Sequence, residues 1–293
     1  MIDFTNLPKR NKTYTGANGS KISVVYNNQT YMLKFPTLSN QKSANTSSCA
    51  SEYIGCQIFE SIGIPAQETL LGTYNVNGKE KLVIACKDFT SSGIVLQDFA
   101  SLKNTILDTN QNGYSTELDD IIYAINEQQS VPSEELKRHF WDMFIVDALI
   151  GNSDRHNGNW GFLYNVATDE IKLAPIYDCG SCLYPQADEE TMTETLNNKS
   201  QRDMRVFSNP LSAIKIKGRK INYFDFISSL QNKDCNDALK RIVPKIKMNE
   251  IERIIDETPY ITDLQKRFYK VMIAERKTLI LDFSSKKLFD KKF

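Results

Sequence analysis

The hydrophobic pattern of the chain changes its period near residue 90, and this change constrains the fold more than any other feature. Upstream of it, "KISVVYNN" (21–28) and "QTYMLKFP" (29–36) alternate and are rich in β-branched and aromatic residues, which is typical of strands. The stretch "TLLGTYNVNGKEKLVIACKDF" (69–89) predicts a further hairpin, because its Asn-Gly pair favours a tight turn. One helix is expected between them at about 50–62, since isoleucines recur on one face and Gly63 follows.

Downstream of residue 90, the stretch "SVPSEELKRHFWDMFIVDALIGN" (130–152) predicts a helix that begins at Pro132 and Ser133. Its apolar residues wrap most of the way round, so we expect it to be buried. Two strands, "WGFLYN" and "EIKLAPIYD", and then several amphipathic helices are expected to follow. The pattern predicts an α+β fold of two lobes with a cleft between them. The N-lobe (1–88) would be small and strand-rich with one helix, and the C-lobe (89–293) larger and mainly helical.

Composition excludes several classes of protein. Lys and Arg number 36 and Asp and Glu also 36, and this zero net charge argues against a nucleic-acid partner. We expect no membrane span, no secretory signal and a cytoplasmic location, because no apolar run is long enough. The six scattered cysteines predict reduced thiols. "CGSC" (179–182) has redox spacing but lies deep in the chain, and no second pair completes a zinc site, so both uses are disfavoured.

The polar loop in "IGNSDRHNGNWGFLY" (150–164) joins the buried helix to a strand and contains Asp154, His156 and Asn159. An Asp in such a loop can orient a hydroxyl and accept its proton. Asp178 ends the second strand, so a hairpin would bring it to the same edge as Asp154 and Asn159. Two carboxylates and one amide oxygen suit Mg²⁺ better than zinc. Mg²⁺ beside a base is the minimum that phosphoryl transfer requires.

Phosphoryl transfer also requires a cation for the phosphate oxygens and a cover over the phosphates. "YMLKFP" supplies Lys34 on a predicted strand, and "TYTGANGSKISV" (13–24) supplies a turn whose amides could face a triphosphate. A plain hairpin turn remains an alternative for this segment. The residues of the predicted cover are Gly16, Ala17, Asn18, Gly19 and Ser20.

The motif "GNSDRHNGNWGFL" (151–163), followed by "PIYD" (175–178), resembles the signature of HipA-like serine/threonine protein kinases. A similar D-R-H-x-x-N pattern occurs in phosphoinositide 3- and 4-kinases. The resemblance runs from "GANGSK" to the C-terminal helices, and it is strongest to stand-alone bacterial members. The extra N-terminal subdomain of toxin-type HipA proteins is missing, which argues against their antitoxin-dependent, DNA-bound role.

The resemblance implies ATP and Mg²⁺ as cofactors and a protein with a Ser or Thr acceptor as substrate. It makes Asp154 the catalytic base, Asn159 and Asp178 the metal ligands, and Lys34 the phosphate-contacting lysine. His156 would support the loop and help to position the γ-phosphate. The usual Phe after the metal-binding Asp is absent from "YDCG", so switching that depends on this Phe is not expected.

Further roles follow from the same resemblance, some with alternatives. Glu52 is preferred over Glu60 as the partner of the phosphate-contacting lysine, and Arg155 would face either the substrate or the carbonyls of its own loop. Residues 84–89 lie where an interlobe hinge would offer backbone groups to adenine, with Cys86 and Lys87 as the candidates.

Two other functions remain open from the sequence. A phosphoinositide-type lipid kinase would fit the D-R-H-x-x-N match, although the zero net charge and modest size argue against it. A pseudokinase acting as a binding module is the other, and it is disfavoured because a module that only binds would not need to keep all four of Lys34, Asp154, Asn159 and Asp178. The resemblance further suggests autophosphorylation at Thr13, Thr15 or Ser20, a monomer, and secretion or translocation into a host cell with a role in bacterial virulence.

Overall fold

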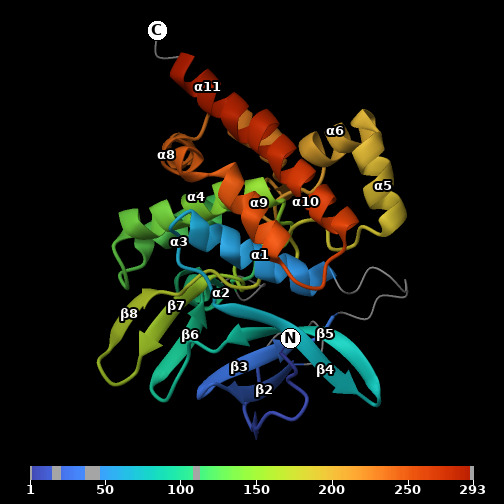
Figure 1. Cartoon of the computed structure of the whole chain (residues 1–293). Coiled ribbons are helices and arrows are strands. Elements are labelled where there is room, and N and C mark those ends of the chain that lie inside the picture. The colour runs from blue at the N-terminus through green and yellow to red at the C-terminus, as the bar shows by residue number, and fades with distance from the viewer. Residues whose placement is uncertain (1, 15–20, 37–46, 108–112, 291–293) are drawn as a thin grey trace.

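The computed structural model describes residues 2–14, 21–36, 47–107 and 113–290. Its N-terminal part is an antiparallel sheet of five strands in the order β1-β2-β3-β5-β4 (Figure 1). The expected mixture of a strand-rich region and helices is confirmed. The strands are β1 (Lys9–Arg10), β2 (Lys21–Tyr26), β3 (Gln29–Lys34), β4 (Thr69–Val76) and β5 (Lys79–Lys87).

Tight turns set the register of both hairpins in this sheet. Asn77 and Gly78 join β4 to β5 with φ angles of 52° and 79°, as the Asn-Gly pair predicts for a two-residue turn. Asn27 and Asn28 join β2 to β3 with φ angles of 47° and 60°. Asparagine tolerates this left-handed region better than most residues. The resulting register places Lys34, the last residue of β3, opposite Lys21 and Ile84.

Helix α1 (Ser47–Ser61) lies between the five-stranded sheet and the helices of the C-terminal part (Figure 1). It begins at Ser47 rather than near residue 50, and Gly63, with a φ of 84°, follows its end. Its buried Ile54, Ile58 and Phe59 belong to the main hydrophobic core of the C-terminal part. Since α1 also contacts β4 and β5, it links the two regions.

A second sheet, of three strands, is one feature that the sequence pattern did not predict. It consists of β6 (Ile94–Asp98), β7 (Gly161–Asn165) and β8 (Glu170–Leu173), in that order. The strands β7 and β8 were expected, but β6 was not, because its partner β7 lies far along the chain and Val95 and Leu96 remain exposed. This sheet fixes the point at which the segment carrying Asp178 leaves β8.

The rest of the described chain is mainly helical and packs around α4 (Ser133–Ile150), which is buried along most of its length as expected. Gly151 ends α4 in the left-handed conformation, with a φ of 64°, and releases the polar loop that follows. The other helices are α2 (Phe99–Ile106), α3 (Leu118–Glu127), α5 (Glu189–Asn197), α6 (Lys199–Phe207), α7 (Tyr223–Ser229), α8 (Lys233–Ile242), α9 (Met248–Glu257), α10 (Asp263–Arg276), a π-helical turn (Lys277–Asp282) and α11 (Phe283–Asp290).

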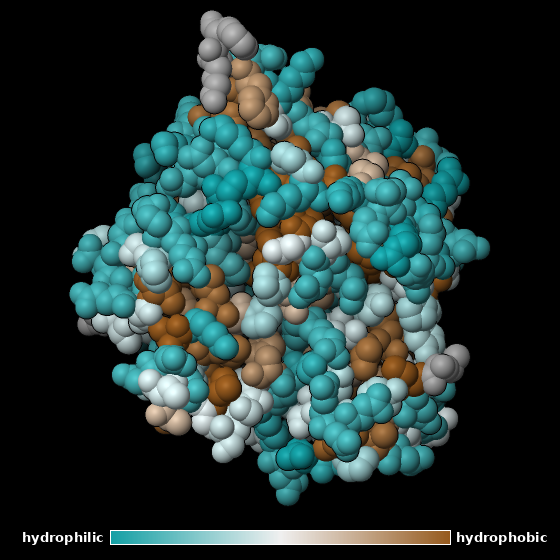
Figure 2. Space-filling view, turned by 60° about the vertical axis from the view of Figure 1, so that its left-hand side comes forward, coloured by the Kyte–Doolittle hydropathy of each residue, from teal (hydrophilic) through white to brown (hydrophobic). Residues whose placement is uncertain are grey.

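Figure 2 shows one face of the molecule, on which hydrophilic residues dominate and apolar residues appear as separate areas. Within the described residues, no helix is both long and apolar enough to span a membrane. The basic run 215–220 forms a short exposed hairpin of β9 (Lys215–Ile216) and β10 (Arg219–Lys220).

Candidate active site

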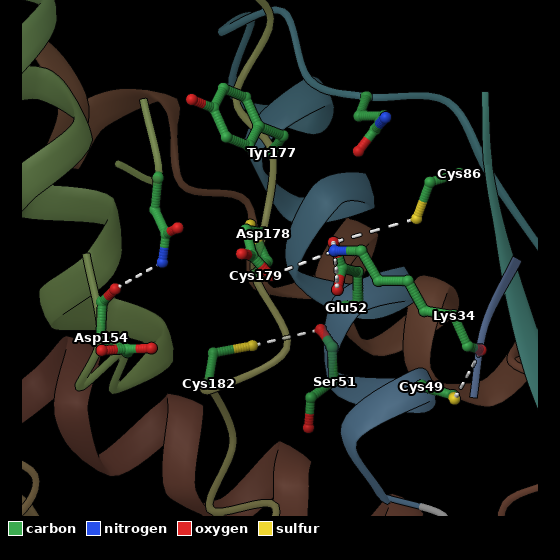
Figure 3. A network of polar contacts seen from close by, with 12 residues as sticks. Lys34, Cys49, Ser51, Glu52, Cys86, Asp154, Tyr177, Asp178, Cys179 and Cys182 are labelled. Carbon is green, nitrogen blue, oxygen red and sulfur yellow. Dashed lines mark hydrogen bonds and ion pairs between the residues drawn. The ribbon is translucent and has the colours of Figure 1, made fainter. Parts of the chain in front are cut away.

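Three charged side chains from distant parts of the chain meet at one point. The Nζ of Lys34, at the end of β3, lies 2.8 and 2.9 Å from the two carboxylate oxygens of Glu52 in α1. It also lies 3.1 Å from Oδ1 of Asp178, in the segment after β8. Figure 3 shows Lys34 reaching toward Glu52 and Asp178, with Asp154 on the opposite side of Asp178. The structure thus pairs Lys34 with Glu52, whereas Glu60 accepts a hydrogen bond from the backbone N–H of Ala66.

The electrostatics of this cluster keep the lysine charged. Burial alone would lower the pKa of Lys34, but the carboxylates of Glu52 and Asp178 raise it well above 10.5. The Lys34 ammonium in turn lowers the pKa of Asp178. The side chain of Glu52 is 3% exposed and that of Asp178 is 46% exposed. Asp178 can therefore reach a bound ligand, while Glu52 acts from behind the lysine.

A buried arginine connects this cluster to the polar loop. Arg155 is 2% exposed and forms an ion pair with Asp147 of α4, with 3.0 Å between Nε and Oδ2. Its guanidinium also donates to the backbone carbonyls of Asn159 and Tyr177 and to the Sγ of Cys179. Arg155 therefore faces the carbonyls of its own loop, not the substrate, and it holds the residues on both sides of Asp178.

Asp154 and Asn159 are joined through the backbone of the loop. The side-chain amide of Asn159 donates to the carbonyl of Asp154 at 2.8 Å, which directs its nitrogen inward. Among the described residues, neither carboxylate oxygen of Asp154 accepts a hydrogen bond, and the same holds for Oδ1 of Asn159. These oxygens are available to a ligand.

His156 stabilises the loop locally. Its Nδ1 accepts a hydrogen bond from the backbone N–H of Gly158 at 3.0 Å, and its ring meets Tyr114 edge-on. The hydroxyl of Tyr177 donates to the carbonyl of Gly158 at 3.1 Å. These contacts hold the His156 ring against its own loop, and its role toward a phosphate stays a prediction.

The segment around Asp178 is held tightly on both flanks. The backbone N–H of Ile176 donates to the carbonyl of Pro65, and the carbonyl of Ile176 accepts from Gln67, both at 2.8 Å. Asp178 itself has a φ of 58°, in the left-handed region that non-glycine residues rarely adopt. Strained conformations of this kind cluster at functional sites, where the surrounding structure enforces them.

The two residues predicted to contact adenine have separate environments. The thiol of Cys86 lies 4.0 Å from Glu52, so its side chain borders the lysine cluster. The backbone N–H of Lys87 donates to Glu68, and its carbonyl accepts from the side chain of Gln67. That carbonyl therefore already accepts one hydrogen bond, and the adenine contact stays a prediction. The predicted cover, Gly16, Ala17, Asn18, Gly19 and Ser20, lies outside the described residues.

The oxygens that remain available suit a magnesium–nucleotide complex. No group of three or more His, Cys, Asp or Glu that could hold a metal occurs within the described residues. Mg²⁺ bound with substrate phosphates usually takes only one or two protein carboxylates and keeps several waters. The Asn159 amide oxygen and the half-exposed Asp178 carboxylate fit that pattern.

Three functional neighbours escaped the sequence analysis: Asp147, Asn152 and Tyr177. Asp147 is 1% exposed and also accepts a hydrogen bond from Asn152, whose backbone carbonyl accepts from the hydroxyl of Tyr223. The only signal for Asp147 was a carboxylate inside the apolar run "MFIVDALIG". A buried charge needs a partner, but the sequence did not indicate which one.

Comparisons with known proteins agree with this geometry. A family model described as "HipA-like C-terminal domain" matches residues 11–258. The serine/threonine-protein kinase CtkA of Helicobacter pylori (strain J99) is 48% identical over 287 residues, covering 96% of this chain and 86% of that protein. This confirms the resemblance to HipA-like serine/threonine protein kinases. A solved structure titled as a Helicobacter pylori proinflammatory kinase CtkA matches with a TM-score of 0.94 and 46% identity, covering 100% of this chain and 99% of that one.

A more distant solved structure shows the fold alone. HipA of Shewanella oneidensis MR-1, solved with HipB and operator DNA, matches with a TM-score of 0.58 and 14% identity. The match covers 97% of this chain and 67% of that one, so part of that HipA chain has no counterpart here.

Proposed function

Because the chain belongs to the family of HipA-like C-terminal domains, we propose that it is an ATP- and Mg²⁺-dependent kinase that phosphorylates Ser or Thr hydroxyls on proteins. That it is a protein kinase follows from its similarity to CtkA, a serine/threonine-protein kinase. The observation that carries the proposed mechanism is the ion cluster of Lys34, Glu52 and Asp178 beside the loop of Asp154 and Asn159.

In the proposed mechanism, magnesium-bound ATP supplies the γ-phosphoryl group, and the protein contributes positioning and charge. Lys34 neutralises charge on phosphate oxygens, and Glu52 keeps the ammonium in place. Asn159 and Asp178 would hold the metal through their available oxygens. Asp154 accepts the proton of the acceptor hydroxyl, since both of its carboxylate oxygens lack other partners in the described chain. A general base of this kind contributes about 10²–10⁴-fold in rate.

Finer parts of the proposal rest on the family resemblance. Residues 1–88 and 89–293 would act as two lobes around the nucleotide, with the cover at residues 16–20 and adenine near Cys86 and Lys87. Autophosphorylation would occur at Thr13, Thr15 or Ser20, where added charge would repel the nucleotide phosphates. We further propose a monomer that is made in the cytoplasm and acts on a protein substrate after translocation into a host cell.

Transfer of labelled γ-phosphate from ATP and Mg²⁺ tests the proposal. The acceptors are the protein itself and a generic basic protein, and the variants are Asp154→Ala and Asp178→Asn. We expect label with the wild type and its loss in both variants. Nucleotide binding without any transfer would instead indicate a pseudokinase, and transfer only to lipid vesicles would indicate a phosphoinositide-type kinase.

A further inference from the structure

A cavity of about 390 Å³ lies beside the polar loop, and Lys34 is not among the residues that line it. Gly151 and Ser153, just before the proposed base, form part of its lining, and so do Ser181 and Tyr184 from the segment that follows Asp178. Thr191 of α5 and Arg205 of α6 also line it. Its volume falls within the range of pockets that bind small ligands or side chains. Nothing in the proposed mechanism uses this cavity.

Tyr184, which lines the cavity, lies on strained backbone. Leu183 and Tyr184 are consecutive non-glycine residues with φ angles of 57° and 56°. Each such residue costs about 1–3 kcal/mol, which the surrounding structure must offset. The backbone N–H of Leu183 donates to the carbonyl of Ile150 at 2.9 Å, and the hydroxyl of Tyr184 donates to the carbonyl of Arg205 at 2.6 Å. Strain held in this way is typical of a segment whose shape serves binding.

Arg205 lines this cavity, whereas Arg276 lies behind the lining, in contact with the hydroxyl of Tyr184, and neither pairs with a carboxylate of the described residues. Arg205 uses one nitrogen to bond Gln201 and forms no ion pair in the described chain. Arg276 is 1% exposed, donates to the carbonyls of Ala148 and Arg205 and to the hydroxyl of Tyr184, and likewise has no carboxylate partner there. One nitrogen of the Arg276 guanidinium is buried without any hydrogen-bond partner among the described groups.

Arg205 has no counter-ion among the described residues, and a charge-assisted hydrogen bond from its guanidinium to a carboxylate is stronger than a neutral one. The acidic residues that begin α5 do not form the lining, and the first of them, Asp188, caps the helix through the N–H of Thr191. We infer that the cavity binds the carboxylate of an Asp or Glu that lies near the acceptor Ser or Thr of the substrate. This inference rests on the proposed function, because it assigns the cavity to the acceptor segment of the phosphorylation reaction.

Direct binding tests the inference without catalysis. The probes are fluorescent peptides with a central Ser and one Glu placed at each flanking position in turn, with Gln as the neutral counterpart. The protein carries Asp154→Ala to prevent turnover. We expect one Glu position to tighten binding about tenfold over Gln, and Arg205→Ala to abolish that difference. Equal binding of the Glu and Gln peptides, or a Glu preference that survives Arg205→Ala, would overturn the inference.

Kinetics on the active protein separate this inference from the proposed function. Arg205→Ala should raise KM for the preferred Glu peptide about tenfold with little change in kcat, since the contact is made equally in the ground and transition states. Lys199→Ala is the matched control, because it removes a positive charge from the same helix at a side chain that is 78% exposed and pairs with Asp203. Equal phosphate transfer to the Glu and Gln peptides would support the proposed kinase activity and reject the carboxylate-binding cavity. A Glu preference in binding with no transfer to any acceptor would support the carboxylate-binding cavity and reject the proposed kinase activity.

Discussion

Arg155→Met should destabilise the protein by several kcal/mol, because Arg155 is the only cation that pairs with Asp147 in the described structure. Asp147 is 1% exposed, and an ion pair of this kind is costly to break from one side. A buried charge left without its partner typically costs about 3–5 kcal/mol. The carbonyls of Asn159 and Tyr177 would also lose a donor. Against a total stability of about 5–15 kcal/mol, this is a large fraction.

The charge itself, rather than lost packing, should dominate that cost. Burial raises the pKa of Asp147, whereas the nearby Arg155 guanidinium acts to lower it. Replacing the carboxylate in the Asp147→Asn/Arg155→Met double variant removes the uncompensated charge. We therefore expect the double variant to be more stable than Arg155→Met alone by about 2 kcal/mol or more.

Urea unfolding followed by tryptophan fluorescence measures both effects, because Trp141 and Trp160 are each 1% exposed in the core. The control is Arg138→Met, whose side chain is 61% exposed and lies 3.7 Å from Asp142, where a loss below about 1 kcal/mol is expected. If the double variant unfolds at the same urea concentration as Arg155→Met or a lower one, the reasoning about the buried charge is wrong.

Three further predictions concern pH, packing and catalysis. Burial lowers the pKa of His139 to about 4 from an ordinary 6.5, so the unfolded state binds a proton in this range before the folded state does. The contribution of His139 to the free energy of unfolding should be fully present above pH 6.5 and fall by up to about 3 kcal/mol toward pH 4. His139→Phe should reduce this pH dependence in urea titrations at several pH values. Gly55→Ala, which would stabilise an ordinary helix, should instead cost about 1–3 kcal/mol in thermal unfolding, because the added Cβ would lie 2.7 Å from that of Cys179. Glu52→Gln should lower kcat/KM for ATP about 10²-fold by misplacing the phosphate-binding lysine, whereas Glu60→Gln, on the same helix but bonded to a backbone N–H, should change it little. An equal loss in the two Glu variants would contradict the assigned pairing.

Local chemistry accounts for the parts of the fold that could be predicted. The Asn77-Gly78 turn adopts its left-handed geometry because those two residues favour it, and the hairpin then follows from alternation in β4 and β5. Helix α4 could likewise be recognised from its start at Pro132 and its apolar content. Strand β6 could not, because it is short and half-exposed and its neighbour in the sheet, β7, lies far along the chain.

The candidate site likewise has features that the sequence predicts and features that depend on tertiary packing. Sequence alone proposed which residues carry the chemistry: Lys34 on a strand, Asp154 and Asn159 in one loop, and Asp178 after the next hairpin. Those assignments depend on residue type and spacing within a few positions, together with a family resemblance. The choice of Glu52 over Glu60 as the partner of Lys34 was a preference, and only the packing of α1 against β3 and the Asp178 segment settled the pairing.

Tertiary structure alone decided where the long-range charges meet. Arg155 could have faced a substrate or its own loop, and it turned inward because Asp147 on α4 needs a counter-ion in the core. The cavity between the loop, α5 and α6 is lined by Ser153, Tyr184 and Arg205, which come from three separate segments of the chain. Periodicity and turn chemistry act over a few residues, whereas Lys34 and Asp178, which are 144 positions apart, meet only when their segments pack together.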